Sequence, residues 1–377
     1  MSCNFTSVKR KFIVGGNSFD SNIEALVYHS CHPHNDLYYD IGYNFIYNFE
    51  LWKKEPLYSI SHYLRQHARL ISEKYDNIFL LYTGGTDSQT MLDAFIAEKI
   101  KNITLITNRG NMDLTSTDFE KNFRYLEKTV SVEKWLEQNK QTMKDLNYTH
   151  FFYRGESFER NQYEKILVDN DFHDYNNDVF AATSWVNGKS DLRHIVTAQK
   201  TNSCIVMGFE KPRLTLINDD SVWAWQFRSG YLHRVDLICG NDHVDAIDFY
   251  FSDDIPEIQI KLAWLKSKIL EKIILTHKLP FTEKIVRELQ SNTGRYYETI
   301  NNAMGYRAAN ALLNSIRSKE LNLKTANLKT HFYKDILQNY YQYIKQNINN
   351  DFIGHRGDVT AIKTKAVPIR PIKAALF

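Results

Sequence analysis

Six consecutive residues, Thr83 to Ser88 (TGGTDS), combine the backbone freedom and the hydroxyl groups that an anion-binding turn needs. Gly84 and Gly85 allow the backbone to turn its N–H groups inward. The hydroxyl donors of the segment are Thr83, Thr86 and Ser88. Because a helix is predicted to begin here, these donors would surround a helix N-terminus, where N–H groups and the helix dipole attract negative charge. The segment therefore predicts an anion-binding loop.

The carboxylate of Asp87 indicates which kind of anion the loop would bind. Beside a bound phosphate it would be repelled unless a divalent cation lay between the two groups, so the loop predicts Mg²⁺ together with a polyphosphate. The sequence contains neither a GxxxxGK[ST] loop nor a GxGxxG segment after a predicted strand, which are the commoner nucleotide signatures. The alternative is a Gly-Gly turn capped by an aspartate before an ordinary helix.

A strand before the loop and a helix after it must hold the loop in place. Ile78 to Tyr82 is a short apolar run closed by the glycine pair, which predicts a buried strand. Asp87 or Ser88 is expected to cap the helix that follows. The apolar side of that helix is formed by Met91, Leu92, Phe95 and Ile96.

Three further strands are predicted at Asn102–Thr107, Tyr148–Tyr153 and Cys204–Phe209. A strand, a helix and a second strand within about thirty residues form a βαβ unit, whose two strands must be parallel. The sequence therefore predicts an α/β fold built on a parallel sheet. An amphipathic helix over Leu57–Lys74 is expected to lead into the first strand.

With this order of elements, TGGTDSQ resembles the SGGxDS motif of the PP-loop ATP pyrophosphatases, and Thr83 keeps the hydroxyl of the family's first serine. The resemblance implies a Rossmann-like, doubly wound parallel sheet with ATP and Mg²⁺ as cofactors. It also implies cleavage of ATP between the α and β phosphates, transfer of AMP to a carboxylate or amide-type oxygen, and displacement by a nitrogen or sulfur nucleophile. In such a site the N–H groups of residues 84–86 and the hydroxyls of Thr83 and Ser88 would bind phosphate, and Asp87 would hold Mg²⁺.

Ligands of parallel sheets bind beyond the carboxyl ends of the strands, so the residues that follow two predicted strands are further candidates. Asn108 and Arg109 follow the second strand, where they would contact adenine or substrate. Arg109 could pair with a phosphate or a carboxylate there. The alternative for Arg109 is an ordinary surface position.

Glu210 and Lys211 follow the fourth predicted strand. In the asparagine-synthetase-like branch of the family, a glycine and acidic residues at this place lie near the pyrophosphate and its metal. The segment GFEKP matches that run only in position. We expect Lys211 to neutralise the departing pyrophosphate and Glu210 to hold metal or substrate, and the alternative is an ordinary surface turn.

Three regions are expected: a small β-rich lead-in over residues 1–56, the ATP-binding domain over 57–254, and a basic, mainly helical region over 255–377. Strands are predicted in the lead-in at Lys11–Val14 and across Gly42–Leu51, and HSCHPHND at 29–36 is either a metal site or a polar loop. The lead-in does not resemble the glutaminase domain of asparagine synthetases, so ammonia or an amine must come from elsewhere. The order of elements is similar to phage-encoded asparagine-synthase-like proteins that lack this domain.

The 377 residues suffice for one large domain or two ordinary ones. No stretch approaches the ~20 apolar residues of a membrane span, and the N-terminus lacks the apolar core of a signal peptide. We therefore expect a protein of the cytoplasm, the host cytoplasm if it is viral, with no membrane partner. The four scattered cysteines favour reduced thiols and argue against a zinc ribbon or an iron–sulfur site.

Charge is distributed unevenly along the chain. Residues 261–377 carry 20 Lys and Arg against 8 Asp and Glu, a balance of +12 that leaves −9 for residues 1–260. This surplus predicts either a nucleic-acid or other polyanionic partner, or a solvated helical surface beside an acidic neighbour. Helices are predicted in this part at Pro256–Ile274, Thr282–Gln290, Ala303–Ser318 and His331–Ile348, and the tail from Gly357 is expected to be irregular or strand-like.

Three functions agree with these features. The first is an ATP-dependent ligase that forms an amide or related C–N bond on a small carboxylate. The second is an enzyme that activates a nucleobase carbonyl in RNA, DNA or a free nucleotide; the basic C-terminal third supports it, while the missing CxxC pair argues against thiolation. The third is a non-catalytic nucleotide-binding or host-interaction module, against which the intact loop with Asp87 and Ser88 counts.

Overall fold

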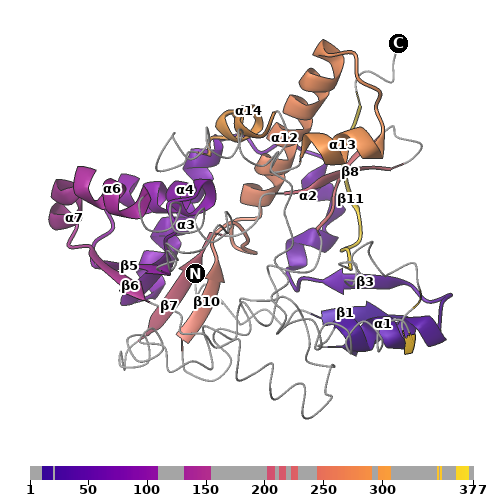
Figure 1. Cartoon of the computed structure of the whole chain (residues 1–377), viewed down its shortest axis with the longest axis horizontal. Coiled ribbons are helices and arrows are strands. Elements are labelled where there is room, and N and C mark those ends of the chain that lie inside the picture. Colours follow the sequence, from indigo (N-terminus) through magenta and orange to yellow (C-terminus); the bar gives the residue numbers. More distant parts are fainter. Residues whose placement is uncertain are drawn as a thin grey trace, which may run out of the picture.

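Figure 1 shows the chain as a computed structural model. The structure describes residues 11–19, 22–108, 131–153, 202–208, 212–217, 222–227, 244–290, 296–306, 346–347, 349 and 362–372.

A five-stranded parallel sheet lies at the centre of the described part, in the spatial order β10-β7-β4-β5-β6. Its strands are β4 (Asn77–Leu81), β5 (Ile103–Asn108), β6 (Thr149–Tyr153), β7 (Ser203–Met207) and β10 (Val244–Asp248). The four strands predicted from the sequence are confirmed, and the predicted parallel pairing of the first two is confirmed by β4 and β5. The order of strands reverses between β4 and β7, because the chain adds β5 and β6 on one side of β4 and β7 and β10 on the other.

Both faces of β4 and β7, at the centre of the sheet, are buried, which explains why these two strands are almost continuously apolar. In β4, Ile78 and Leu80 belong to the main core cluster, whereas Phe79 and Leu81 are buried on the opposite face. Side chains alternate between the two faces of a strand, so an apolar residue is needed at every position.

Helices α3 (Ile60–Lys74) and α4 (Thr86–Ala97) pack side by side against the face that carries Ile78 and Leu80. The helix expected over Leu57–Lys74 begins three residues later, because the Ser59 side chain accepts a hydrogen bond from the His62 N–H and so caps it. Farther along, α6 (Ser131–Gln138) and α7 (Lys140–Asp145) precede β6.

A second sheet is antiparallel, in the order β11-β9-β8. It consists of β8 (Leu214–Ile217), β9 (Val222–Trp225) and β11 (Val367–Pro371). The strand-like character expected of the C-terminal tail is confirmed, since β11 pairs with β9 about 140 residues away in sequence. The fully buried Trp225 packs on Trp52, whose ring centroid lies 5.2 Å away.

The N-terminal part forms a third sheet, in the order β2-β1-β3, beside helix α1 (Asn22–Cys31). Its strands are β1 (Lys11–Val14), β2 (Asn17–Phe19) and β3 (Leu37–Asp40), so the strand predicted at Lys11–Val14 is confirmed. The strand predicted across Gly42–Leu51 is wrong, because a 3₁₀ helix η1 (Asn44–Tyr47) and α2 (Phe49–Trp52) occupy that range. The physical reason is the packing of Trp52. Its Nε1–H donates to the Phe45 carbonyl at 3.1 Å and its ring stacks on that of Phe45, while the same ring packs on the distant Trp225.

The C-terminal helices of the described part are α12 (Glu257–Thr276), α13 (Glu283–Leu289) and α14 (Tyr297–Ala303). The first two confirm the predicted helices there. A helix was also expected to begin at Ala303, but α14 ends at that residue. Gly305 has φ +81°, and the N–H groups of Gly305 and Tyr306 donate back to the carbonyls of Asn302 and Asn301, which closes the helix C-terminus. The range 307–318 lies outside the described residues.

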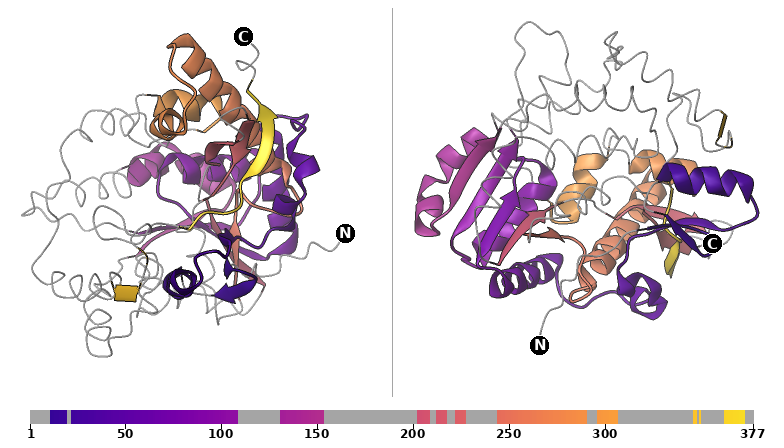
Figure 2. Two further views of the ribbon diagram at one scale, coloured as in Figure 1. Left: turned by 90° about the vertical axis from the view of Figure 1, so that its right-hand side faces the viewer. Right: turned by 90° about the horizontal axis from the view of Figure 1, so that it is seen from below.

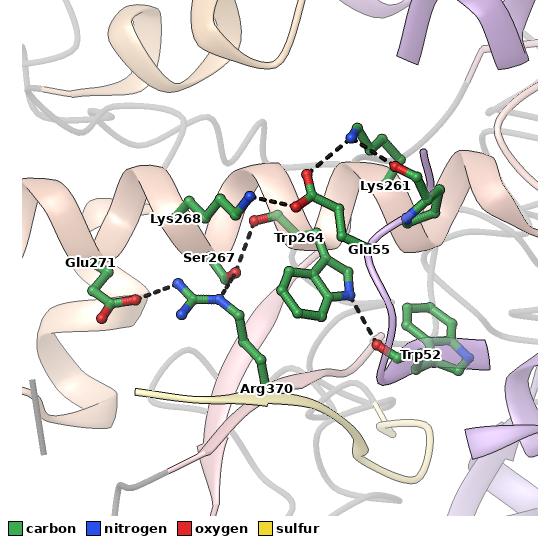
Figure 3. Close-up of polar contacts among 9 residues, drawn as sticks. Trp52, Glu55, Lys261, Trp264, Ser267, Lys268, Glu271 and Arg370 are labelled. Atoms are coloured by element: carbon green, nitrogen blue, oxygen red, sulfur yellow. Dashed lines mark hydrogen bonds and ion pairs between the residues drawn. The ribbon is translucent and has the colours of Figure 1, made fainter. Parts of the chain in front are cut away.

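Helix α12 lies between the parallel sheet and the N-terminal sheet (Figures 1 and 2). Its Lys261 Nζ donates to Glu55 at 2.9 Å, and Lys268 pairs with the same carboxylate (Figure 3). Burial alone would raise the pKa of Glu55, but these two ammonium groups outweigh it and hold that pKa below its usual value. The Trp264 Nε1–H donates to the Trp52 carbonyl at 2.9 Å. These contacts fix the lead-in against α12.

The C-terminal strand is fixed to the same helix. Arg370 of β11 donates from Nε to Ser267 Oγ at 2.8 Å and forms a buried ion pair with Glu271 (Figure 3). Both charged side chains are at most 7% exposed. A buried pair of this kind specifies which partner the strand takes, because either charge alone would be costly to bury.

Candidate functional site

The loop at Thr83–Ser88 leaves β4 at its carboxyl end, beside the boundary between β4 and β7 where the order of strands reverses. Ligands of open parallel sheets bind at this kind of place. Gly84 has φ +70°, a left-handed conformation that favours glycine, and Gly85 is the N-cap residue of α4. The predicted order of strand, glycine turn and helix is therefore confirmed.

The prediction that Asp87 or Ser88 caps α4 is wrong. The helix begins at Thr86, and the extended residue before it is Gly85, which makes no side-chain cap. Asp87 and Ser88 are therefore the second and third residues of the first turn. Ser88 nevertheless stabilises the turn, because its hydroxyl donates to the Gly85 carbonyl at 3.3 Å and accepts from the Thr83 N–H at 3.2 Å.

The hydroxyl groups of Thr83 and Ser88 lie on the same side of the turn, with 3.1 Å between Oγ1 and Oγ. Thr83 Oγ1 also accepts from the Gly85 N–H at 3.4 Å. Two hydroxyls this close can contact one bound oxyanion together. The structure thus brings together the hydroxyl donors that the sequence singled out on either side of the glycine pair.

The first turn of α4 supplies the remaining groups. The Gln89 N–H donates to the Gly85 carbonyl at 2.9 Å, and this is the first main-chain hydrogen bond of α4. The N–H groups of residues 86–88 lie before it, in the turn where a helix presents N–H groups that its own carbonyls do not reach. Thr86 is buried, and its carbonyl accepts from Thr90 Oγ1 at 2.8 Å. Asp87 is half-buried, and its Oδ1 atom is enclosed by protein.

A Mg²⁺ ion bound with a nucleotide fits this set of donors. Such an ion takes one or two protein carboxylates and completes its octahedron with phosphate oxygens and water. Asp87 provides one carboxylate at the N-terminus of α4. Within the described ranges, no three His, Cys, Asp or Glu side chains gather into a metal site made of protein alone.

The end of β7 approaches the backbone of Asp87 closely. A Cβ atom added to Gly208 would lie 3.2 Å from the Asp87 carbonyl oxygen and 3.4 Å from the Tyr250 ring. The Tyr250 hydroxyl donates to that same carbonyl oxygen at 2.6 Å. Sequence reasoning missed Tyr250, and the only signal for it was the aromatic run that directly follows β10.

Glu210 and Lys211, predicted at the end of this strand, lie outside the described residues. The described chain stops two residues short of Glu210, at Gly208 beside the loop.

A hydrogen-bonded chain ties α4 to the strand that precedes it. The Tyr82 hydroxyl donates to Gln89 Oε1 at 2.6 Å, and Gln89 Nε2 donates to Asp93 Oδ1 at 2.7 Å. Burial raises the pKa of Tyr82 well above its usual value, so the hydroxyl stays protonated and remains a donor. This chain sets the position of α4 relative to β4.

On the other side of β4, Thr107 near the end of β5 and His150 near the start of β6 contact each other next to Tyr82. Thr107 Oγ1 donates to the Tyr82 carbonyl at 2.7 Å and lies 2.9 Å from His150 Nε2. Because the one hydroxyl hydrogen of Thr107 goes to Tyr82, the proton of this contact belongs to His150 Nε2. Burial lowers the pKa of His150 to about 4, so the ring is neutral at pH 7.

His150 was also missed from the sequence, because a single histidine inside a strand carries no motif. Asn108, which was predicted as a binding residue, is the last residue of β5 and so lies at this edge of the sheet. Arg109 falls outside the described residues.

The histidine-rich segment of the lead-in makes local contacts. His29 Nε2 lies 3.1 Å from the Asn35 carbonyl, and His32 Nδ1 lies 2.9 Å from the Tyr28 carbonyl. Each ring thus uses one nitrogen on the backbone of its own segment.

In the described part, every helix is too short or too polar to cross a membrane. Comparisons with known proteins leave the site to be interpreted from its own geometry: no protein-family model matches the sequence, and no curated protein matches it.

Proposed function

We propose that this protein is an ATP-dependent, AMP-forming enzyme of the PP-loop type, which activates a carboxylate or carbonyl oxygen of its substrate and then forms an amide or related C–N bond. One observation carries the proposal: the TGGTDS segment forms a glycine turn with φ +70° at Gly84 between β4 and α4, where the strand order reverses. A Rossmann-like, doubly wound arrangement of the parallel sheet belongs to the same proposal.

In this proposal the N–H groups of residues 84–86 and the hydroxyls of Thr83 and Ser88 bind the phosphates of ATP. Asp87 holds Mg²⁺, which when bound neutralises phosphate charge. The contact of 3.1 Å between the two hydroxyl oxygens supports a shared oxyanion.

The chemical step needs alignment more than a protein nucleophile. A substrate oxygen attacks the α-phosphorus, and the bond from that phosphorus to the oxygen bridging the α and β phosphates breaks. Pyrophosphate leaves with the electron pair. Ammonia or an amine, supplied from elsewhere, then attacks the activated carbon. The C–N bond forms, the nitrogen loses one proton to solvent, and AMP leaves with the electron pair of the broken C–O bond.

Four further residues are assigned roles in this proposal because each follows, or ends, a strand whose carboxyl end lies at the same edge of the sheet as the loop. Lys211 would neutralise the departing pyrophosphate and Glu210 would hold metal or substrate, because both follow Gly208, which borders the Asp87 carbonyl. Asn108 and Arg109 would contact adenine or substrate at the end of β5.

A nucleobase or nucleic-acid substrate is the second candidate, and the charge distribution favours it. Residues 261–377 have a balance of +12, which suits a polyanionic partner. RNA or DNA binding whose affinity falls with added salt, with a smaller salt slope after C-terminal lysines are neutralised, would select this substrate class over a small carboxylate.

The product of ATP turnover tests the proposal. The full chain is incubated with α-labelled ATP, Mg²⁺ and a pool of small metabolites, and we expect labelled AMP together with pyrophosphate. Asp87→Asn should abolish AMP formation while leaving the unfolding temperature nearly unchanged. The matched control is Asp145→Asn, at an exposed aspartate of α7, which should keep full turnover.

Two results would overturn the proposal. ADP with phosphate as products would exclude AMP transfer, and full AMP formation by Asp87→Asn would remove the metal role of that carboxylate. Binding of Mg²⁺ and ATP without turnover of any substrate would favour a non-catalytic nucleotide-binding module.

A further inference from the structure

The carbonyl oxygen of Asp87 accepts a hydrogen bond from a residue that is distant in sequence. The Tyr250 hydroxyl donates to it at 2.6 Å across 163 residues of sequence. Tyr250 is the second residue beyond β10 and is fully buried. Burial raises the pKa of its phenol well above the usual value, so the hydroxyl is protonated and remains a donor at neutral pH. This contact links the outermost strand on one side of the sheet to the first turn of α4.

A second observation concerns the same oxygen. The end of β7 passes so close that a Cβ atom at Gly208 would lie 3.2 Å from the Asp87 carbonyl oxygen, tighter than ordinary van der Waals contact. That atom would also lie 3.4 Å from the Tyr250 ring. Glycine at this position therefore lets β7, Tyr250 and the first turn of α4 meet at one point.

The Tyr250 ring is itself held from two sides. Phe249 meets it edge-on with ring centroids 5.4 Å apart, and Tyr306, just beyond α14, packs on it at 5.5 Å. Its direction is thus set by packing, so the hydroxyl has little freedom to leave the Asp87 carbonyl.

We propose that Tyr250 is a positioning residue of the Thr83–Ser88 loop: through the Asp87 carbonyl it sets the first turn of α4, and thereby the direction of the Asp87 carboxylate and of the N–H groups beside it. Gly208 provides the space that this contact requires. The part of this inference that concerns Mg²⁺ and ATP rests on the proposed function, whereas the part that concerns the turn does not.

The first test needs no ligand. Tyr250→Phe removes only the hydroxyl and keeps the ring that packs on Phe249 and Tyr306. In the full chain, amide hydrogen exchange of residues 86–91 should become about tenfold faster, the scale of opening expected from losing one buried hydrogen bond. Exchange in α12 should stay unchanged.

The matched control is Tyr148→Phe. The Tyr148 hydroxyl is also buried, but within the described part of the protein it makes no hydrogen bond. Its removal should leave exchange of residues 86–91 as in the wild type. Gly208→Ala, which pushes a methyl group against the same carbonyl, should change exchange in the direction of Tyr250→Phe.

The second test measures how binding of ATP depends on Mg²⁺. Tyr250→Phe should raise the Mg²⁺ concentration for half-maximal ATP binding several-fold, because the Asp87 carboxylate is less well directed, while Tyr148→Phe should not. A general loss of stability would lower the amount of folded protein without moving this midpoint.

Three outcomes decide the matter. Unchanged exchange in Tyr250→Phe, or an increase of equal size in α12, overturns the positioning role. Faster exchange confined to residues 86–91 with an unmoved Mg²⁺ midpoint overturns the link from the turn to the carboxylate. Faster local exchange in a protein whose wild type binds no Mg²⁺ and ATP supports the positioning of the turn and overturns the nucleotide assignment.

Discussion

Acidification should destabilise the fold through His67. This histidine of α3 is fully buried, its Nδ1 lies 2.8 Å from the Phe249 carbonyl, and its ring stacks on that of Phe249. Burial lowers the pKa of His67 from 6.5 to about 4, and the hydrogen bond to Phe249 opposes this shift only in part. The neutral ring is therefore the form that the folded protein prefers.

The sign and size of the effect follow from these two pKa values. Above pH 6.5 the ring is neutral in both states and the contribution of His67 to stability is fully present. As the pH falls from 6.5 toward about 4, the unfolded chain takes up a proton that the folded chain refuses, so the free energy of unfolding decreases. At about 1.4 kcal/mol per pKa unit, the loss is about 2 kcal/mol at pH 5 and about 3 kcal/mol at the lower limit.

Urea unfolding at pH 7.5 and pH 5.0 measures this loss. His67→Gln should reduce the difference between the two free energies of unfolding by about 2 kcal/mol relative to the wild type, whatever its own cost in stability. His62→Gln is the matched control, because His62 is an exposed histidine of the same helix. Equal pH dependence in the wild type and in His67→Gln would refute the reasoning. His150, whose pKa burial also lowers to about 4, adds a smaller loss in the same direction because it is partly exposed.

Two substitutions test other features of the structure. Gly84→Ala should cost about 1–2 kcal/mol, because its backbone has φ +70°, and should also weaken ATP binding, whereas Gly16→Ala, at φ +88° with open space around it, should carry the backbone cost alone. Equal ATP binding by the two variants in a titration would contradict the role of the turn. Arg370→Met should lower the free energy of unfolding by about 3–5 kcal/mol, because Glu271 keeps a buried charge, and adding Glu271→Met should recover most of that loss. Chemical denaturation checks this, and a double variant as unstable as Arg370→Met would show that the ion pair is not the cause.

Much of the central unit follows from short-range rules. The apolar run at Ile78 to Tyr82, the glycine pair and the apolar stripe of the next helix each involve neighbouring residues, and the structure contains all three. The same holds for α12. Where consecutive residues favour the same local conformation, tertiary contacts stabilise that conformation and do not have to change it.

The error at Gly42–Leu51 arises where distant contacts override a local pattern. Aromatic residues there favour a strand by propensity, but packing of Trp52 on Trp225 and the hydrogen bond from Trp264 Nε1–H to the Trp52 carbonyl stabilise helical turns. The capping of α4 was misplaced by two or three residues, because both glycine and the polar residues after it suit a helix N-terminus.

By itself, the sequence determined the glycine turn at Thr83–Ser88, the place of its carboxylate and the elements on either side, since turn chemistry and periodicity act between neighbouring residues. Only the tertiary structure decided what surrounds the loop: Tyr250 and Gly208 at the Asp87 carbonyl, and His150 beside Thr107. Tyr250 and Gly208 lie just beyond the ends of β10 and β7, and His150 lies in β6. The places of these strands beside β4 and β5 depend on the order in which the strands pair. That order depends on pairing between strands that are far apart in the sequence, which no local pattern contains.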